Sequence, residues 1–184
     1  MSDRKINSIC VFCGASVGSD PAFVRAAADL GTMMAKNGIR LVFGAGHVGM
    51  MGTVADSIMA AGGEAIGVIP EFLRDREQAH QGLTELHVVD SMHVRKQMMF
   101  DLSDAFIVLP GGLGTIEEMF EMITWRQLGR HDKPIILIST NDYWKPFEDM
   151  VCRVVDSNFA HGDANTYFSI ASDPTDAMDI LQSV

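Results

Sequence analysis

The stretch AFIVLPGGLGTIEEMF, residues 105–120, carries the strongest indication of the fold. It begins with an apolar run of strand length, Ala105–Leu109, and continues through a proline and three glycines. A helical pattern follows, and it contains two adjacent acids, Glu117 and Glu118. A buried strand that ends in a glycine-rich turn and leads into a helix is the repeating unit of α/β folds with a parallel sheet.

The same unit recurs on both sides of this stretch. Helical patterns separate the strand-like runs, and their starts and stops are recognisable, as at Ser19-Asp20-Pro21, Asn37-Gly38 and Asp173-Pro174. The alternation predicts one domain over residues 1–184, a doubly wound parallel sheet with helices on both faces. The other predicted strands are Ile6–Cys13, Ile39–Phe43, Ala65–Ile69, Leu86–Val89, Pro134–Ile138 and a weaker one at Tyr167–Ile170.

Composition narrows the classes of function. The net charge of −10 argues against non-specific binding to nucleic acid or to an anionic membrane, because both need clustered basic residues. The first apolar run is too short for a signal sequence or a membrane span, so we expect a cytoplasmic protein. Cys10 and Cys13 match C-x-x-C, but within a strand their side chains point to opposite faces. We therefore expect free thiols and no metal or redox site.

Three glycine-rich loops follow predicted strands, at residues 13–18, 44–49 and 110–115. In a parallel sheet they lie along one edge, where their N–H groups and a helix N-terminus can bind an anion such as phosphate. One such loop alone is equally well explained as a tight turn, and the second also fits G-x-G-x-x-G, so an NAD(P)-dependent oxidoreductase remains an alternative. The candidate phosphate and ribose residues are Gly14, Ser16, Gly44, Gly46, Gly49, Gly111, Gly112, Gly114 and Thr115.

Two charged side chains are predicted on apolar helix faces. Arg95 projects from the methionine-rich side of a helix capped by Ser91, and Glu118 shares a face with Met122 and Trp125. An inward guanidinium needs an anionic partner, which is either a structural acid or a ligand. Together with the loops, the two charges suit a phosphorylated substrate that develops positive charge elsewhere during the reaction.

These motifs resemble those of a known family. Met92–Lys96 followed by Pro110–Glu118 is similar to the paired signature of the LONELY GUY family of cytokinin riboside 5′-monophosphate phosphoribohydrolases, which are often labelled lysine decarboxylases. The resemblance implies a Rossmann-like fold, a homodimer, no cofactor, no metal and hydrolysis of the N-glycosidic bond of adenosine 5′-monophosphate, prenylated or plain. It implies Arg95 and Glu118 as the catalytic pair, and substrate contacts from Glu77, Lys96, Gly112, Leu113, Gly114, Thr115 and Thr124.

A decarboxylase, a metal site and a nucleotide-binding module are the alternatives to this assignment. A decarboxylase that uses pyridoxal phosphate needs a Schiff-base lysine, whereas Lys96 beside an inward arginine is better explained as a phosphate or substrate contact. The six histidines show no metal-ligand spacing. A non-catalytic nucleotide-binding or sensing module on the same scaffold remains the second alternative, although binding alone would not need a carboxylate near an anionic ligand.

Overall fold

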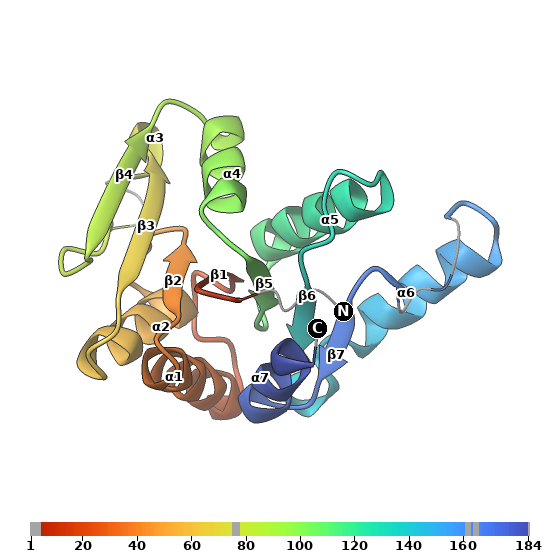
Figure 1. Ribbon diagram of the computed structural model, residues 1–184, viewed down its shortest axis with the longest axis horizontal. Coiled ribbons are helices and arrows are strands. Elements are labelled where there is room, and N and C mark those ends of the chain that lie inside the picture. Colours follow the sequence, from red (N-terminus) through yellow and green to blue (C-terminus); the bar gives the residue numbers. More distant parts are fainter. Residues whose placement is uncertain (1–4, 75–77, 161–162, 164–165, 184) are drawn as a thin grey trace.

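The computed structural model describes residues 5–74, 78–160, 163 and 166–183. Its centre is a seven-stranded parallel sheet with the strand order β4-β3-β2-β1-β5-β6-β7 (Figure 1). Each strand coincides with one of the predicted runs, with ends that differ by at most two residues. The strands are β1 Ser8–Phe12, β2 Arg40–Phe43, β3 Ala65–Pro70, β4 Glu85–Val89, β5 Ala105–Val108, β6 Ile135–Ile138 and β7 Ser169–Ala171.

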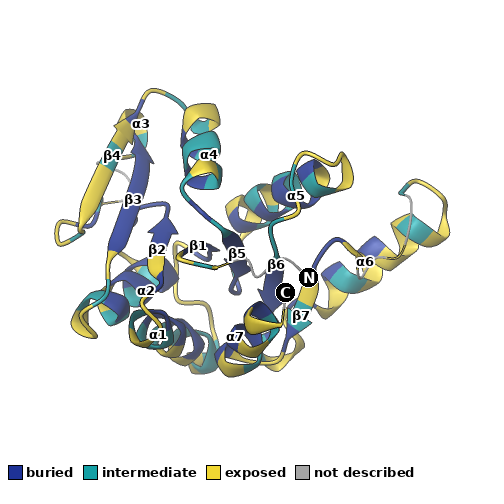
Figure 2. Ribbon diagram, in the orientation of Figure 1, coloured by how far each residue is buried: buried dark blue, intermediate teal, exposed yellow. Residues whose placement is uncertain are grey.

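Helices cover both faces of the sheet, as predicted. One buried cluster joins the sheet to α1 (Pro21–Lys36), α2 (Gly49–Ala60) and α7 (Pro174–Gln182). A second cluster joins the other face to α4 (Met92–Asp101), α5 (Leu113–Gln127) and α6 (Lys145–Asp156). The central strands are buried between these two layers, and the outer helix faces are exposed (Figure 2). Two short helices, α3 (Glu71–Arg74) and the 3₁₀ helix η1 (Thr140–Asp142), lie in connections.

Strand alternation separates the two cysteines of the C-x-x-C sequence. Cys10 belongs to the cluster under α4, α5 and α6, and Cys13 belongs to the cluster under α1, α2 and α7. Both thiols are buried and free. In the part of the chain that the structure describes, no helix has the length and apolar character needed to cross a membrane.

The predicted helix starts are formed by side-chain caps. The Asp20 carboxylate accepts from the N–H of Ala22 at the start of α1, and the Ser91 hydroxyl accepts from the N–H of Val94 at the start of α4. Asp173 caps α7 in the same way. Helix α5 is different, because it begins after Gly112 and no side chain caps it. Its first N–H groups are therefore left without a protein side-chain partner at the cap.

The topology creates a crevice at one edge of the sheet. Strand β1 lies between β2 and β5, and the chain leaves these two neighbours toward opposite faces of the sheet. At such a switch point the loops beyond the strand ends separate, and ligands bind there in open α/β sheets. The loops after β1 and β5 meet at this place, where the N–H of Gly14 donates to the carbonyl of Pro110 at 3.1 Å.

The close contact between α1 and α2 leads to a prediction on stability. A Cβ atom at Gly31 would lie 2.6 Å from the carbonyl oxygen of Val54 and 3.0 Å from the backbone nitrogen of Ile58. Helix propensity favours Gly31→Ala by about 1 kcal/mol, but overpacking against backbone costs about 1–3 kcal/mol, so steric strain decides the sign. We expect a lower free energy of unfolding in urea. In the same assay Gly114→Ala should raise it, because nothing lies within 4 Å of a Cβ there; stabilisation by Gly31→Ala would contradict this packing.

Candidate active site

A cavity of about 570 Å³ lies beyond the carboxyl ends of β1 and β5. Loops that are far apart in the sequence line it, together with side chains from α2, α4 and α5. The cavity brings together eight of the residues that the sequence singled out, namely Gly14, Ser16, Arg95, Gly111, Gly112, Gly114, Thr115 and Glu118. The convergence of the first and third glycine loops on one cavity is as expected from the sheet topology.

Arg95 is held in the cavity wall by the backbone of two neighbouring strands. Its side chain is buried, with the residue only 4% exposed. The Nε–H donates to the carbonyl of Val68 in β3 at 3.1 Å, and Nη2 donates to the carbonyl of Gly44 after β2 at 3.0 Å. These two bonds fix the plane of the guanidinium, and its remaining N–H groups provide the positive charge at the cavity.

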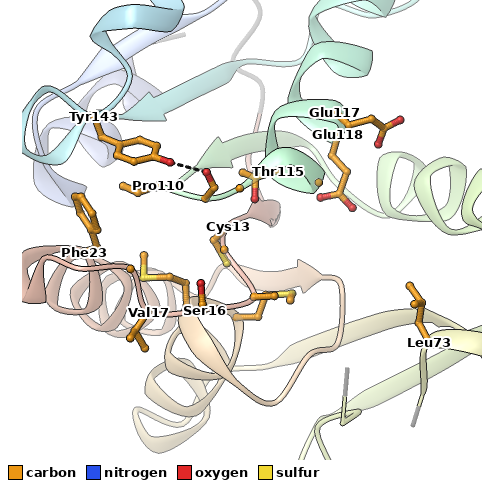
Figure 3. Close-up of a pocket in the computed structure, with 18 of the residues that line it drawn as sticks. Cys13, Ser16, Val17, Phe23, Leu73, Pro110, Thr115, Glu117, Glu118 and Tyr143 are labelled. Atoms are coloured by element: carbon orange, nitrogen blue, oxygen red, sulfur yellow. Dashed lines mark hydrogen bonds between the residues drawn. The ribbon is translucent and has the colours of Figure 1, made fainter. Parts of the chain in front are cut away.

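Glu118 reaches the cavity from the second turn of α5. Both Glu117 and Glu118 line the cavity. Figure 3 shows the Glu118 carboxylate turned toward the cavity and the Glu117 carboxylate pointing away from it. Glu118 is half-buried and Glu117 is exposed, as the helical pattern predicted, because Met122 and Trp125 on the face of Glu118 are buried in the core. Arg95 and Glu118 thus lie on the walls of one cavity but come from different helices.

The N-terminus of α5 gives the cavity a set of free backbone donors. The first hydrogen bond within this helix runs from the N–H of Ile116 to the carbonyl of Gly112 at 3.0 Å. The N–H groups of the three preceding helical residues have no carbonyl within the helix to bind, and the helix dipole adds partial positive charge there. Such an end binds phosphate well. Thr115, expected at the helix entry, lies two residues inside the helix and is buried.

Burial disfavours the nucleophilic thiolate form of the two thiols beside this site. Burial raises the pKa of Cys13, and the negative charge of Glu118 raises it further. Burial likewise raises the pKa of Cys10 well above its ordinary value, again with a contribution from Glu118. A thiol whose pKa is raised stays protonated near neutral pH, so Cys13 lines the cavity as an apolar group.

Lys96, predicted as a substrate contact, lies in an ion-pair cluster between α4 and α5. Its Nζ is 2.5 Å from Glu117 and 3.0 Å from Glu121. Burial lowers the pKa of Lys96, but the hydrogen bonds and charges of the two glutamates outweigh burial, and the net pKa is raised. The side chain does not line the cavity. Its charge therefore stabilises the packing of α4 on α5.

This cluster gives a second prediction. Lys96→Met should lower the free energy of unfolding by about 1 kcal/mol in low salt, because it leaves two close carboxylates unpaired. The loss should shrink in 1 M NaCl, where the charges are screened. Lys145→Met is the matched control, because Lys145 pairs with Glu148 and Asp149 in a more exposed setting and should matter less. A raised KM for the substrate with unchanged stability would instead support the direct substrate contact that the family resemblance implies.

Several other predicted site residues lie outside the cavity lining. Leu113 and Thr124 are exposed on α5, with Thr124 about 9 Å farther along the helix axis than Glu118. Glu77 lies outside the described residues. Gly44, Gly46 and Gly49 form the loop after β2, which contributes to the site through the carbonyl that holds Arg95.

The G-x-G-x-x-G loop is itself covered by another segment of the chain. The N–H of His80 donates to the carbonyl of Ala45 at 2.9 Å, and the N–H of His47 donates to the carbonyl of Gln78 at 3.1 Å. An isolated antiparallel bridge joins Gly46 to Ala79. One N–H donor of the loop, that of His47, is thus engaged within the protein, and residues 78–80 cover the loop, which disfavours the oxidoreductase alternative.

Apolar and aromatic residues that the sequence did not single out complete the cavity. They come from the first turn of α1, from α2, from α3, from α4 and from the loop after β6, and they are Phe23, Met50, Met51, Leu73, Met92 and Tyr143, with Val17 beside them. Figure 3 shows Phe23 and Tyr143 side by side at one end of the cavity. Tyr143 follows a strand end on the same edge of the sheet as the glycine loops, and this position in the sequence could have indicated that it lies at the site.

A second polar cluster brings His47, Asp56 and His80 together, with ligand atoms within 4.8 Å of one another. The sequence spacing gave no sign of it. The Nε2 of His80 lies 2.9 Å from the Asp56 carboxylate, and its Nδ1 accepts from the N–H of Gly82 at 3.0 Å. A metal on Nε2 would need the ring proton on Nδ1, where the Gly82 N–H already points. The hydrogen bonds therefore favour a structural role for His80.

The chain is similar in sequence to known proteins. A family model described as "Possible lysine decarboxylase" matches residues 51–181. The chain is 50% identical over 140 residues to a cytokinin riboside 5′-monophosphate phosphoribohydrolase of Rhodococcoides fascians, which covers 76% of this chain and 71% of the relative. It is 42% identical over 175 residues to the cytokinin riboside 5′-monophosphate phosphoribohydrolase LOG4 of Arabidopsis thaliana. This match covers 95% of this chain and 80% of the relative.

Solved structures support the fold alone. The molybdenum cofactor binding protein of Rippkaea orientalis superimposes with a TM-score of 0.72 at 22% identity, over 97% of both chains. The Moco carrier protein of Chlamydomonas reinhardtii gives a TM-score of 0.73 at 18% identity, over 98% of both chains. At these identities the similarity concerns the arrangement of the sheet and helices and carries no information on ligands.

Proposed function

Because this chain belongs to the LONELY GUY family, we propose that it hydrolyses the N-glycosidic bond of a nucleoside 5′-monophosphate, yielding the free base and ribose 5-phosphate. The observation that carries the proposal is the presence of Arg95 and Glu118 on one cavity that the open N-terminus of α5 also lines. This cavity offers an anion site and a carboxylate to the same ligand.

In the proposed reaction Glu118 acts at the ribose. Departure of the base breaks the bond between the anomeric carbon and the base nitrogen, and positive charge develops on the ribose ring. The Glu118 carboxylate stabilises that charge and accepts a proton from the attacking water. The water oxygen bonds to the anomeric carbon, and the base leaves with the bonding electron pair and takes a proton from solvent. Glu118 then returns the proton it accepted to solvent, so that one water is consumed per bond broken.

The phosphate is bound away from the bond that breaks. The N–H groups of residues 112–115 and the α5 dipole would hold its oxygens, and the buried Arg95 would hold the substrate and fix Glu118. Binding energy from the phosphate would thus orient the ribose against Glu118. This arrangement explains how a protein with a net charge of −10 can accept an anionic substrate.

The apolar part of the cavity supports a base with an apolar substituent. Phe23, Met50, Met51, Leu73 and Met92 give the cavity a wall on which a prenyl group would be removed from water. The relatives named above act, by their names, on cytokinin riboside 5′-monophosphates. We therefore propose prenylated adenosine 5′-monophosphate as the preferred substrate and plain adenosine 5′-monophosphate as a poorer one.

The description "Possible lysine decarboxylase" does not fit the lysine beside this cavity. A Schiff base with pyridoxal phosphate forms through a neutral amine, which requires a lysine with a lowered pKa. The net pKa of Lys96 is raised, and its amine is engaged by Glu117 and Glu121. The charge state of Lys96 therefore opposes that chemistry.

We propose a homodimer, formed through the layer that carries the site. Helices α4 and α5 leave the apolar side chains of Val94, Leu113 and Leu128 exposed, and a second copy would remove them from water. Light scattering after size exclusion should give twice the mass of the chain, and Leu128→Asp should shift the measured mass to that of the monomer.

For the location of the protein we propose the reducing environment of the cytoplasm, because all three cysteines are free thiols.

Chromatography of the reaction products tests the proposed function. Purified protein is incubated with isopentenyladenosine 5′-monophosphate, with adenosine 5′-monophosphate and with the corresponding nucleosides. We expect free base from both nucleotides, faster from the prenylated one, and none from the nucleosides. Tight nucleotide binding without base release would instead support the sensing module, and binding of NAD(P)H in a fluorescence titration would support the oxidoreductase.

A further inference from the structure

The loop after β6 is held in an unusual backbone conformation beside the cavity. Asn141 and Asp142 both have positive φ, at 52° and 60°, which is uncommon for residues other than glycine. The Asn141 side chain donates to the Asp20 carboxylate at 2.7 Å, and the N–H of Trp144 donates to the Ser139 hydroxyl at 2.9 Å. Such strain persists only where the surroundings fix it, and it is often found at functional sites.

The result of this conformation is the placement of Tyr143. Its hydroxyl donates to the carbonyl of Gly111 at 2.6 Å (Figure 3). Its ring packs edge-on against Phe23, with centroids 5.4 Å apart, and against Trp144, with centroids 4.9 Å apart. The aromatic contacts fix the ring, so the hydroxyl is pre-positioned on the turn that leads into α5.

The hydrogen bond to Gly111 sets the orientation of the peptide that precedes α5. In a trans peptide the carbonyl of one residue and the N–H of the next point in opposite directions, and the described residues contain no cis peptide. When Tyr143 holds the Gly111 carbonyl, the N–H of Gly112 is turned away from Tyr143. Gly112 is the cap residue of α5, so the same bond fixes the start of the row of donors at the helix N-terminus.

The opposite side of the turn is fixed as well. A Cβ atom at Gly111 would lie 2.2 Å from the Thr115 hydroxyl oxygen and 2.8 Å from the Gly14 backbone nitrogen, so only glycine fits. The N–H of Gly14 donates to Pro110, and the N–H of Met50 donates to the carbonyl of Gly14 at 3.1 Å. The loop after β1, itself held by the start of α2, thus supports the glycine turn from one side, and Tyr143 supports it from the other.

We propose that Tyr143 is a positioning residue for the substrate phosphate. Its hydroxyl holds the Gly111–Gly112 peptide so that the N-terminal N–H groups of α5 are pre-organised for the anion. The inference rests on the proposed function for the identity of the anion, a sugar 5′-phosphate. Tyr143 need not touch the phosphate, and it has no part in breaking the glycosidic bond.

The test uses Tyr143→Phe, which keeps the ring and removes the hydrogen bond. Calorimetry measures the binding of ribose 5-phosphate and of adenosine, and steady-state kinetics measures base release. We expect the dissociation constant of ribose 5-phosphate and the KM of the nucleotide to rise about fivefold to tenfold. The kcat should stay within about twofold, because a phosphate that is bound still orients the ribose against Glu118. Adenosine binding should be unchanged, because adenosine has no phosphate.

Each outcome decides the inference. Unchanged ribose 5-phosphate binding in Tyr143→Phe would overturn the positioning role. An equal loss of adenosine binding would overturn it too, because it would indicate a general structural effect, which the melting temperature would also record. A wild-type protein that does not bind ribose 5-phosphate would overturn it as well. A wild-type protein that binds ribose 5-phosphate but releases no base would contradict only the proposed reaction, and the comparison of the two proteins would still test Tyr143.

Discussion

Glu118→Gln should reduce kcat/KM for base release by about a thousandfold and leave the folded structure intact. Glutamine has nearly the same shape, but it can neither accept a proton from water nor stabilise positive charge on the ribose. The carboxylate is half-buried and faces the cavity, and the glutamine amide fills the same space (Figure 3). The measurement is the initial rate of base release at several substrate concentrations. The KM should change much less than kcat, because the phosphate site is untouched.

Glu121→Gln is the matched control for this substitution. Glu121 lies on the same helix and carries the same charge, but it faces Lys96 and not the cavity. The rate of base release by Glu121→Gln should stay within about threefold of wild type, because the Glu121 carboxylate pairs with Lys96 and does not line the cavity. If Glu118→Gln kept wild-type turnover, the carboxylate would have no chemical role, and the proposed mechanism would be wrong.

Arg95→Lys is expected to have the second largest effect, on activity and stability together. The guanidinium bridges the carbonyls of Val68 and Gly44 through two different nitrogens, and a lysine has only one. At least one buried carbonyl loses its partner, which costs about 1–3 kcal/mol in the free energy of unfolding. The positive charge also leaves its fixed position at the cavity. We expect kcat/KM to fall by about a hundredfold or more.

A second arginine separates these two effects. Arg126 donates to the carbonyl of Lys133 at 2.9 Å, at the far end of α5 from the cavity. Arg126→Lys should therefore lower stability in urea with little change in kcat/KM. Should Arg95→Lys behave like Arg126→Lys, with lower stability and full activity, Arg95 would be a structural residue only.

The sheet could be predicted from the sequence because its central strands are buried on both faces. Continuous apolar runs such as Ala105–Leu109 indicate such strands directly, and the capping residues Asp20, Ser91 and Asp173 mark the helices between them. The position of the site followed from the same pattern, since glycine-rich loops after parallel strands share one edge. These features are local in the sequence, so a single amino-acid sequence is enough to detect them.

Contacts between distant segments could not be predicted in this way. The pairing of Lys96 with Glu117 and Glu121 depends on how α4 packs on α5, and no periodicity within one helix reveals it. The covering of Gly44–Gly49 by residues 78–80 likewise joins segments across the sheet edge. Tyr143 reaches Gly111 only because two left-handed residues precede it, and neither is a glycine that would have suggested such a turn.

A crystal structure of the Glu118→Gln variant with intact isopentenyladenosine 5′-monophosphate tests the central claim most directly. We predict the phosphate oxygens on the N–H groups of residues 112–115, and the anomeric carbon about 3–4 Å from the side chain of residue 118. The prenyl group should lie on the apolar wall that includes Met50 and Met51. A nucleotide with its phosphate elsewhere, or with the anomeric carbon turned away from residue 118, would contradict the account.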